Sequence, residues 1–306
     1  MSNREYDVVI IGGGPAGLSA GIYTSRARLR SLLVERVAAG GWIVNAGLVE
    51  NYPGFPQGIS GLELAELMNK QAAKYGLKTF SAEVTGLELK KQQKVVKTTE
   101  GDIAAKAVII AGGSDRVKLG VPGEEEFTGK GVAYCAVCDG YFYRDVPVAV
   151  VGGGNAAVNE ALELSKFASR VTVIHRRQEL RATHILQERA LAEPKIEFLW
   201  NTVVEAIEGE DMVKRLRLRN VLSEEKSVLD ISGIFVAVGS RPNTDYLKGV
   251  LSLDANGTII TNEKMETEVP GIFAAGDIRS GSIRQAIAAA GDGAVAAIYA
   301  EKFVTS

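Results

Sequence analysis

The chain of 306 residues carries 35 Lys or Arg against 37 Asp or Glu, so its formal net charge at pH 7 is −2. Hydrophobic residues make up 46% and charged residues 24%, which is ordinary for folded domains and excludes a disordered chain, a collagen and a coiled coil. The balanced charge gives no reason to expect nucleic acid or an anionic membrane as the main partner. The length suggests two domains. Because a signal peptide and a run of about 18 apolar residues are both lacking, we expect a soluble, cytoplasmic protein.

A dinucleotide-binding pattern occupies the first 35 residues. A β-branched strand over 6–11 leads into a G-x-G-x-x-G turn at residues 12–17, a helical stretch, and a second strand over 31–35 that ends in Glu35. The glycines permit a tight turn, approach of a pyrophosphate, and close helix–strand packing. Glu35 stands 23 residues after Gly12, where an acid accepts hydrogen bonds from a ribose diol. The acidic edge suits the ADP half of FAD, and a turn of small residues without a ligand is the alternative.

Cys135 and Cys138 are the only cysteines, and they form a C-x-x-C pair. Zinc is disfavoured because two further ligands are needed, and the only histidines, His175 and His184, have eight residues between them. Buried inert thiols are a second alternative. The close spacing favours a redox-active dithiol in a reducing compartment. Asp139 follows and could shuttle a proton, or serve only as the turn residue of Asp-Gly.

A second copy of the glycine pattern starts 140 residues after the first, with a strand over 146–151 and another over 170–174. Where the first copy has an acid, this copy has the basic run 175–177, with Arg181 one turn further along. Guanidinium groups bind a 2′-phosphate, which a carboxylate would repel. The second copy therefore predicts an NADPH site, with a solvated basic strand end as the alternative. The residues expected to bind NADPH are Gly152, Gly154, Asn155, Ala156, His175, Arg176, Arg177 and Arg181.

Three more apolar runs, over 107–111, 233–238 and 271–275, end in glycine and are typical of buried parallel strands that turn sharply. The last continues into Asp277, which could bind a hydroxyl or cap a helix. An Ala-rich helix is expected over 282–300.

In order and spacing, these segments resemble the low-molecular-weight (bacterial-type) thioredoxin reductases, FAD- and NADPH-dependent pyridine nucleotide-disulfide oxidoreductases, over essentially the whole chain. The matching stretches are GGGPAG with Glu35, VENYPG (49–54), CAVCDG (135–140), GGGNAA with HRR and Arg181, VAVGSRPN (236–243), and GIFAAGD followed by RQA (284–286). The resemblance implies an α/β fold of two Rossmann-like, three-layer nucleotide-binding domains. The NADPH domain, at 118–245, would be inserted into an FAD domain made of 1–117 and 246–306.

The resemblance also implies a reaction: NADPH reduces FAD, the flavin reduces the disulfide, and the dithiol reduces thioredoxin or a thioredoxin-like protein. By position, Cys138 is the flavin-side sulfur, Cys135 attacks the partner, and Asp139 is the acid–base group. One domain would rotate against the other, and a homodimer is expected. The residues expected to bind FAD are Gly12, Gly14, Pro15, Ala16, Gly17, Glu35, Gly40, Gly41, Asn51, Val84, Gly276, Asp277, Arg284, Gln285 and Ala286.

The chain departs from the family pattern at two places. Residues 42–47 read Trp-Ile-Val-Asn-Ala-Gly where relatives usually have Gln and then threonines, and Gly112 replaces a usual Thr. The first change lies in a segment that approaches the flavin in relatives, so flavin polarity or acceptor docking could differ.

There are three rival functions. A flavin dithiol oxidase or a ferredoxin-fed enzyme of this fold would lack the basic run, so residues 175–177 argue against it. An NADPH–ferredoxin reductase would lack the cysteine pair, so Cys135 and Cys138 argue against that function. A non-catalytic nucleotide-binding redox sensor is distinguished only by assay.

Overall fold

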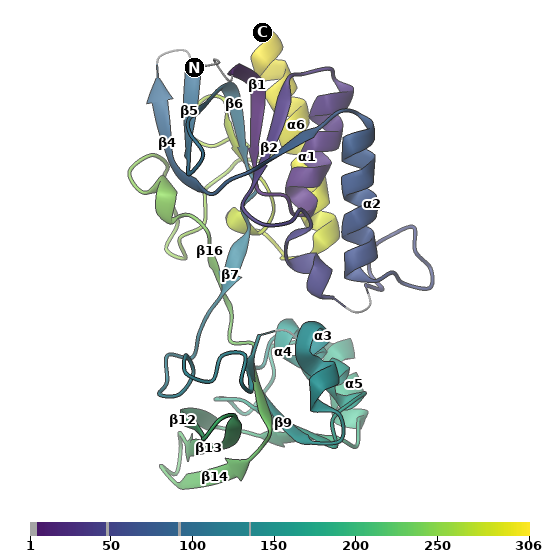
Figure 1. Ribbon diagram of the computed structural model, residues 1–306, viewed down its shortest axis with the longest axis vertical. Helices are drawn as coiled ribbons and strands as arrows, with labels where there is room; N and C mark the ends of the chain where they lie inside the picture. The colour runs from purple at the N-terminus through teal and green to yellow at the C-terminus, as the bar shows by residue number, and fades with distance from the viewer. Residues whose placement is uncertain (1–4, 47–48, 91–92, 135) are drawn as a thin grey trace. The chain divides into compact units, whose positions relative to one another are not determined.

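The computed structural model describes residues 5–46, 49–90, 93–134 and 136–306, with the backbone alone for residues 45, 137, 138 and 240. The chain divides into two compact units (Figure 1). Unit 1 consists of Met1–Asp115 and Arg241–Ser306, and unit 2 of Arg116–Ser240.

Unit 1 is built on a seven-stranded mixed sheet of order β3-β2-β1-β6-β5-β4, with β17 pairing with β6. The strands β1, β2, β3, β6 and β17 are parallel, whereas β5 pairs antiparallel with both β6 and β4. The strands are β1 (Glu5–Ile11), β2 (Ser31–Glu35), β3 (Lys78–Ser81), β4 (Val84–Lys90), β5 (Gln93–Thr98), β6 (Ile103–Ile110) and β17 (Ile272–Ala274).

Both faces of this sheet are covered. Val8 and Ile10 of β1 pack against the helices α1 (Pro15–Arg26), α2 (Gly61–Lys74) and α6 (Ala286–Thr305), which stand side by side in Figure 1. Val9 and Ile11, on the opposite face, belong to a second cluster that includes residues of the segment 246–259. Because successive side chains of a strand alternate between faces, a continuous apolar run such as β1 is what a sheet buried on both sides requires.

Local sequence explains where these helices begin and end. Pro15 occupies the first turn of α1, where its missing N–H removes no hydrogen bond. Ser60 caps α2 by accepting a hydrogen bond from the Glu63 amide at 3.1 Å. Helix α6 begins at Ala286 rather than at 282, because Arg284 adopts a left-handed backbone conformation, with φ of 56°, that a helix cannot include.

Unit 2 contains a five-stranded parallel sheet of order β11-β10-β9-β15-β8 and a three-stranded antiparallel sheet β12-β13-β14. The helices α3, α4 and α5 belong to the same unit (Figure 1). Its elements are β8 (Val132–Ala133), α3 (Ala136–Asp139), η2 (Gly140–Tyr143), β9 (Pro147–Val151), α4 (Asn155–Ser165), β10 (Arg170–Ile174), α5 (His184–Ala192), β11 (Ile196–Leu199), β12 (Thr202–Gly209), β13 (Val213–Asn220), β14 (Lys226–Asp230) and β15 (Gly233–Val236).

The chain passes from one unit to the other twice. The first passage lies within β7 (Ser114–Arg116) and the second at the start of β16 (Ser240–Pro242), and these two strands pair with each other. Three short 3-10 helices complete unit 1: η1 (Gly41–Asn45), η3 (Asp245–Leu247) and η4 (Gly276–Ile278).

Candidate active site and nucleotide sites

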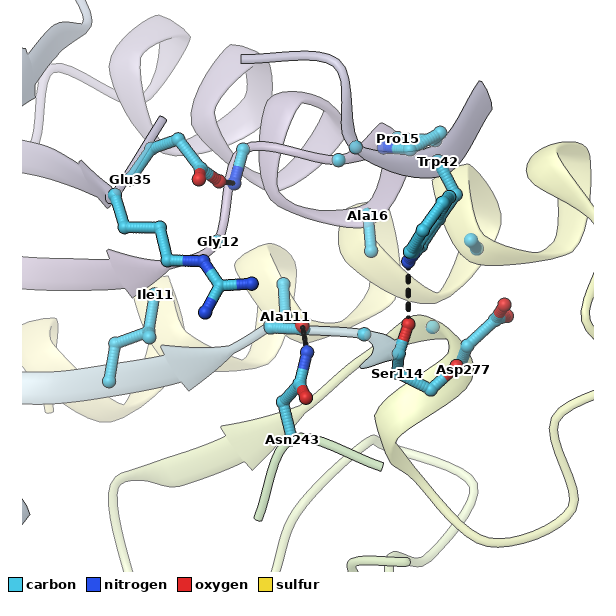
Figure 2. Close-up of a pocket in the computed structure, with 18 of the residues that line it drawn as sticks. Ile11, Gly12, Pro15, Ala16, Glu35, Trp42, Ala111, Ser114, Asn243 and Asp277 are labelled. Atoms are coloured by element: carbon cyan, nitrogen blue, oxygen red, sulfur yellow. Dashed lines mark hydrogen bonds between the residues drawn. The ribbon is translucent and has the colours of Figure 1, made fainter. Parts of the chain in front are cut away.

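A cavity of about 1100 Å³ opens in unit 1 at the carboxyl ends of β1, β2 and β6 (Figure 2). Ligands of parallel α/β sheets bind at this edge, and the volume suits a ligand at the large end of small-molecule pockets. Most of the residues expected to bind FAD line it: Gly12, Gly14, Pro15, Ala16, Glu35, Gly41, Val84, Gly276, Asp277, Arg284, Gln285 and Ala286.

Three residues of the expected FAD set lie outside that lining. A Cβ on Gly17 would sit 1.8 Å from the Gly12 carbonyl oxygen, so Gly17 serves close packing inside the turn. The Gly40 amide donates to the Gly13 carbonyl at 2.7 Å. Asn51 donates from Nδ2 to Oε1 of Gln285 at 2.9 Å, so it contacts a lining residue.

Glu35 orders the glycine turn itself. Its Oε2 accepts a hydrogen bond from the Gly13 amide at 2.7 Å, and its Oε1 accepts one from the Val37 amide at 3.1 Å. Gly12 has φ of +101°, and a Cβ there would lie 2.4 Å from the carbonyl oxygen of Ala111. Only glycine fits this position, so the backbone remains bare where a ligand would approach it.

Trp42, in the segment that departs from the family pattern, lies across this cavity (Figure 2). Its indole Nε1 donates to the carbonyl oxygen of Ser114 at 2.6 Å, and the side chain remains 46% exposed. On the same rim, Asn243 donates to the Gly112 carbonyl at 3.1 Å. The sequence located the unusual segment, but this cross-cavity hydrogen bond has no sequence signal.

A buried ion pair holds the turn that presents Asp277 to the cavity. Asp292 of α6 accepts from Arg279 Nε at 2.6 Å, from Arg279 Nη2 at 2.9 Å, and from the Gly276 amide at 3.1 Å. Burial raises the pKa of Asp277, whose carboxylate accepts a hydrogen bond from Ser282 Oγ at 3.2 Å. An acid in the middle of an Ala-rich helix was the only sequence sign of this arrangement.

One lining group lacks a protein partner. The hydroxyl of Tyr246 is buried and has no hydrogen-bond partner in the described part of the chain. Buried polar groups are normally hydrogen-bonded, so a polar ligand in the cavity would complete this site. The bare glycine turn, the cavity volume and this hydroxyl together fit a bound dinucleotide such as FAD.

The second glycine turn, in unit 2, is open on its edge. Gly152 has φ of +148°, and a Cβ on Gly154 would meet nothing within 4 Å. Asn155 accepts the Thr183 amide at 2.8 Å, while Ala156 is exposed. The side chains of three basic residues beside the turn are exposed, and among the described residues none forms an ion pair: Arg176, Arg177 and Arg181.

His175, from the same basic run, is buried instead. It is 4% exposed, and a Cβ on Gly153 would lie 2.3 Å from its Cε1, so the ring packs directly against the glycine turn. Burial lowers the pKa of His175, and the neighbouring guanidinium groups act in the same direction. The ring supports the turn from within.

The cysteine segment is described only in part. Cys135 lies outside the described residues, and Cys138 is represented by its backbone in α3. Burial raises the pKa of Asp139. The next residues place two exposed aromatic side chains beside this segment, with exposed fractions of 64% and 80%: Tyr141 and Phe142.

Two buried carboxylates that sequence reasoning did not find adjoin the cysteine segment. Glu160 Oε2 accepts the Ala136 amide at 2.5 Å. Glu124, only 1% exposed, accepts the Tyr134 hydroxyl at 2.8 Å. The two contacts span 24 and 10 residues, more than the spacing of neighbours along one helix or strand, so no local pattern predicts them.

Two other kinds of site are absent from the described ranges. No group of three His, Cys, Asp or Glu side chains is arranged to hold a metal ion there. No helix in that part of the chain has the length and apolarity needed to cross a membrane.

Comparison with known proteins agrees with the fold. The pattern of the family described as pyridine nucleotide-disulphide oxidoreductase matches residues 6–293. The thioredoxin reductase of Peptoclostridium acidaminophilum is 44% identical over 305 residues, covering 98% of this chain and 97% of the relative. That of Bacillus subtilis is 45% identical over 306 residues, covering 99% and 96%.

The solved structures agree as well. The crystal structure of Lactococcus lactis thioredoxin reductase matches with a TM-score of 0.95 and 44% identity, covering 98% of this chain and 99% of that one. The prediction of an α/β fold with two dinucleotide-binding domains is confirmed. The chain belongs to the pyridine nucleotide-disulphide oxidoreductase family, in its group of low-molecular-weight, bacterial-type thioredoxin reductases.

Proposed function

We propose that unit 1 binds FAD and that unit 2 binds NADPH and carries the redox-active cysteines of a thioredoxin-disulfide reductase. The chain is an oxidoreductase of this type and uses FAD and NADPH. The observation that supports this assignment of FAD to unit 1 and NADPH to unit 2 is the pair of glycine turns whose edges carry opposite charges. Glu35 stands at the edge of the first turn, and exposed arginines stand at the edge of the second.

The cavity of unit 1 is the proposed FAD site. When bound, FAD supplies the step that turns a hydride from NADPH into the two electrons needed to open a disulfide. The residues would provide binding and orientation: the bare turn at Gly12 would admit the pyrophosphate, and the unpartnered Tyr246 hydroxyl would donate to a polar group of the ligand. Trp42 and Ser114 tie two sides of the cavity together.

The open turn of unit 2 is the proposed NADPH site. Arg176, Arg177 and Arg181 are exposed at its edge and would bind the 2′-phosphate, with charge-assisted hydrogen bonds. His175 is assigned a supporting role beneath the turn, because its ring is buried against Gly153.

Cys135 and Cys138 are the proposed redox pair. In thiol–disulfide exchange, a thiolate attacks one sulfur of the partner's disulfide, the partner's S–S bond breaks, and the second cysteine resolves the mixed disulfide. The products are a reduced partner and a Cys135–Cys138 disulfide, which two electrons from NADPH return to the dithiol. Asp139, whose pKa is raised by burial, is the proposed proton donor and acceptor for this exchange.

The partner is thioredoxin, and we propose that the enzyme acts as a homodimer, on the strength of the family resemblance. The decisive assay mixes purified protein with NADPH or NADH and oxidised thioredoxin, and follows NADPH absorbance and free thiols. Turnover that requires thioredoxin and prefers NADPH is expected. Reduction by NADPH without turnover on any disulfide protein would identify a redox sensor instead. Light scattering in solution tests the dimer.

A further inference from the structure

Glu160 of helix α4 is a buried carboxylate to which the reaction above gives no role. Its side chain is 11% exposed. Oε2 accepts a hydrogen bond from the backbone amide of Ala136 at 2.5 Å, and Oε1 lies 3.2 Å from Nη2 of Arg116. A buried charge is stabilised only when paired and hydrogen-bonded, and Glu160 meets both conditions through these two contacts.

The amide that Glu160 accepts from has a special position. Ala136 follows Cys135 directly in the chain and begins α3, the short helix that contains Cys138 and ends at Asp139. The hydrogen bond therefore fixes the first residue between the two cysteines. The contact links α4 to the first residue of α3 across 24 residues of sequence.

The charge of Glu160 responds to pH within the working range of an enzyme. Burial raises the pKa of Glu160 to about 6, and Asp139 adds to the rise, while Arg116 and the Ala136 amide oppose it. These are the charged groups that act on Glu160 in the described part of the chain, Arg116 from β7 and Asp139 from α3. At neutral pH Glu160 is therefore mainly an anion paired with Arg116.

We propose that Glu160 is a positioning residue of the dithiol–disulfide exchange: it anchors the C-x-x-C segment through the Ala136 amide, and its negative charge restrains thiolate formation in the adjoining cysteine pair. The inference rests on the proposed redox role of Cys135 and Cys138. A neighbouring anion disfavours a thiolate and a neighbouring cation favours it. Loss of the carboxylate would remove one negative charge from beside the Ala136 amide, and would thereby favour the thiolate.

The test measures thiol reactivity in the reduced holoprotein. Because the chain has only two cysteines, all alkylation by iodoacetamide reports on this pair. Glu160→Gln keeps the shape of the side chain and removes its charge. We expect the thiol pKa read from the rate–pH profile to fall by about 0.5–1 unit. A fall of one pKa unit raises the fraction of thiolate about tenfold but makes each thiolate less nucleophilic. At a pH well below the thiol pKa, alkylation should therefore speed up about threefold.

The matched control is Glu163→Gln, which removes a carboxylate from the same helix that pairs with Lys166 at 2.6 Å. Its alkylation profile should equal that of the unmodified protein. Arg116→Gln is the second variant, and it should shift the thiol pKa upward, which decides the question if Glu160→Gln does not fold. A Glu160→Gln protein with normal flavin content and an unaltered profile would overturn the proposal.

The outcome is separable from that of the proposed function. If Cys135→Ser and Cys138→Ser retain full thioredoxin reduction, the dithiol mechanism fails. If those variants lose activity while Glu160→Gln leaves the thiol pKa in place, the mechanism stands and only the role of Glu160 is refuted.

Discussion

Because the hydroxyl of Tyr246 is buried without a partner in the described part of the chain, Tyr246→Phe should affect the FAD-free and the FAD-bound protein differently. In Tyr246→Phe the unpaired hydroxyl is gone, so the stability of the FAD-free protein should stay equal or rise. With FAD bound, a hydrogen bond is lost, so FAD affinity should weaken about three- to tenfold, since such a bond contributes about 0.5–1.5 kcal/mol. Fluorescence titration of the apoprotein and urea unfolding measure the two quantities.

Tyr299→Phe is the control, because Tyr299 lies on α6 against Lys264 and Lys302 and does not line the cavity. Equal FAD affinity in Tyr246→Phe and the unmodified protein would mean that the ligand does not reach this hydroxyl.

The arginines at the edge of the second turn should set the preference for NADPH. Each charge-assisted hydrogen bond to a phosphate contributes about 1.5–3 kcal/mol. The double change Arg176→Gln and Arg177→Gln should therefore raise KM for NADPH at least about tenfold and leave KM for NADH nearly unchanged.

Arg170→Gln serves as the control, since Arg170 begins β10 at the end opposite this turn. Steady-state kinetics with both nucleotides provides the measurement. If the unmodified enzyme used NADH and NADPH equally well, the argument from the basic run would be contradicted.

At the scale of elements, helix α6 packs against α1 so closely that one glycine is required. A Cβ on Gly293 would lie 2.0 Å from the Ala16 carbonyl oxygen, whereas a Cβ on Gly291 would meet nothing within 4 Å. Gly293→Ala should therefore lower the free energy of unfolding by about 1–3 kcal/mol through overpacking. Gly291→Ala, in the same helix, should raise it by about 1 kcal/mol, because Ala is the better helix former.

Urea unfolding of both variants measures the difference, with their flavin content as a second readout of the cavity next to Ala16. If the two alanines have equal effects, the close approach of the helices is not what determines stability there.

The elements that sequence could predict are those with strong local patterns. The glycine turns at residues 12–17 and 152–157 follow apolar strands, and both lie where the spacing indicated. The start of α6 was misplaced by four residues, because the left-handed backbone conformation of Arg284 has no signature in the sequence. The Arg116–Glu160 pair joins β7 to α4, and no periodicity along either element reveals such a contact.

In the sites too, local sequence patterns predicted which residues matter, whereas tertiary packing determined their partners. Glu35 was predicted from its distance to Gly12, but its two hydrogen bonds to the turn backbone are a tertiary result. Trp42 was noticed as an exception to a family pattern, yet its bond to Ser114 spans 72 residues. Sequence patterns thus predict which residue types gather, while the partners of buried polar groups depend on packing.

At the scale of the whole molecule, electrons must pass from NADPH through FAD to a disulfide and then to a second protein. Cys135→Ser or Cys138→Ser should each abolish thioredoxin reduction. Neither sulfur takes part in hydride transfer from NADPH, so FAD content and flavin bleaching by NADPH should persist in both variants. Anaerobic stopped-flow absorbance measures the bleaching, and insulin or thiol-release assays measure thioredoxin reduction.

The order of attack is then read by trapping, because a cysteine left without its resolving partner holds the mixed disulfide it forms. Each reduced variant is mixed with oxidised thioredoxin and run on a non-reducing gel. The resemblance predicts that Cys138→Ser, which retains Cys135, accumulates the complex. Accumulation by Cys135→Ser instead would assign the attack to Cys138, whose backbone lies within α3 next to Asp139. Full disulfide-reductase activity in either variant would mean that the C-x-x-C pair is not the path by which electrons leave the flavin.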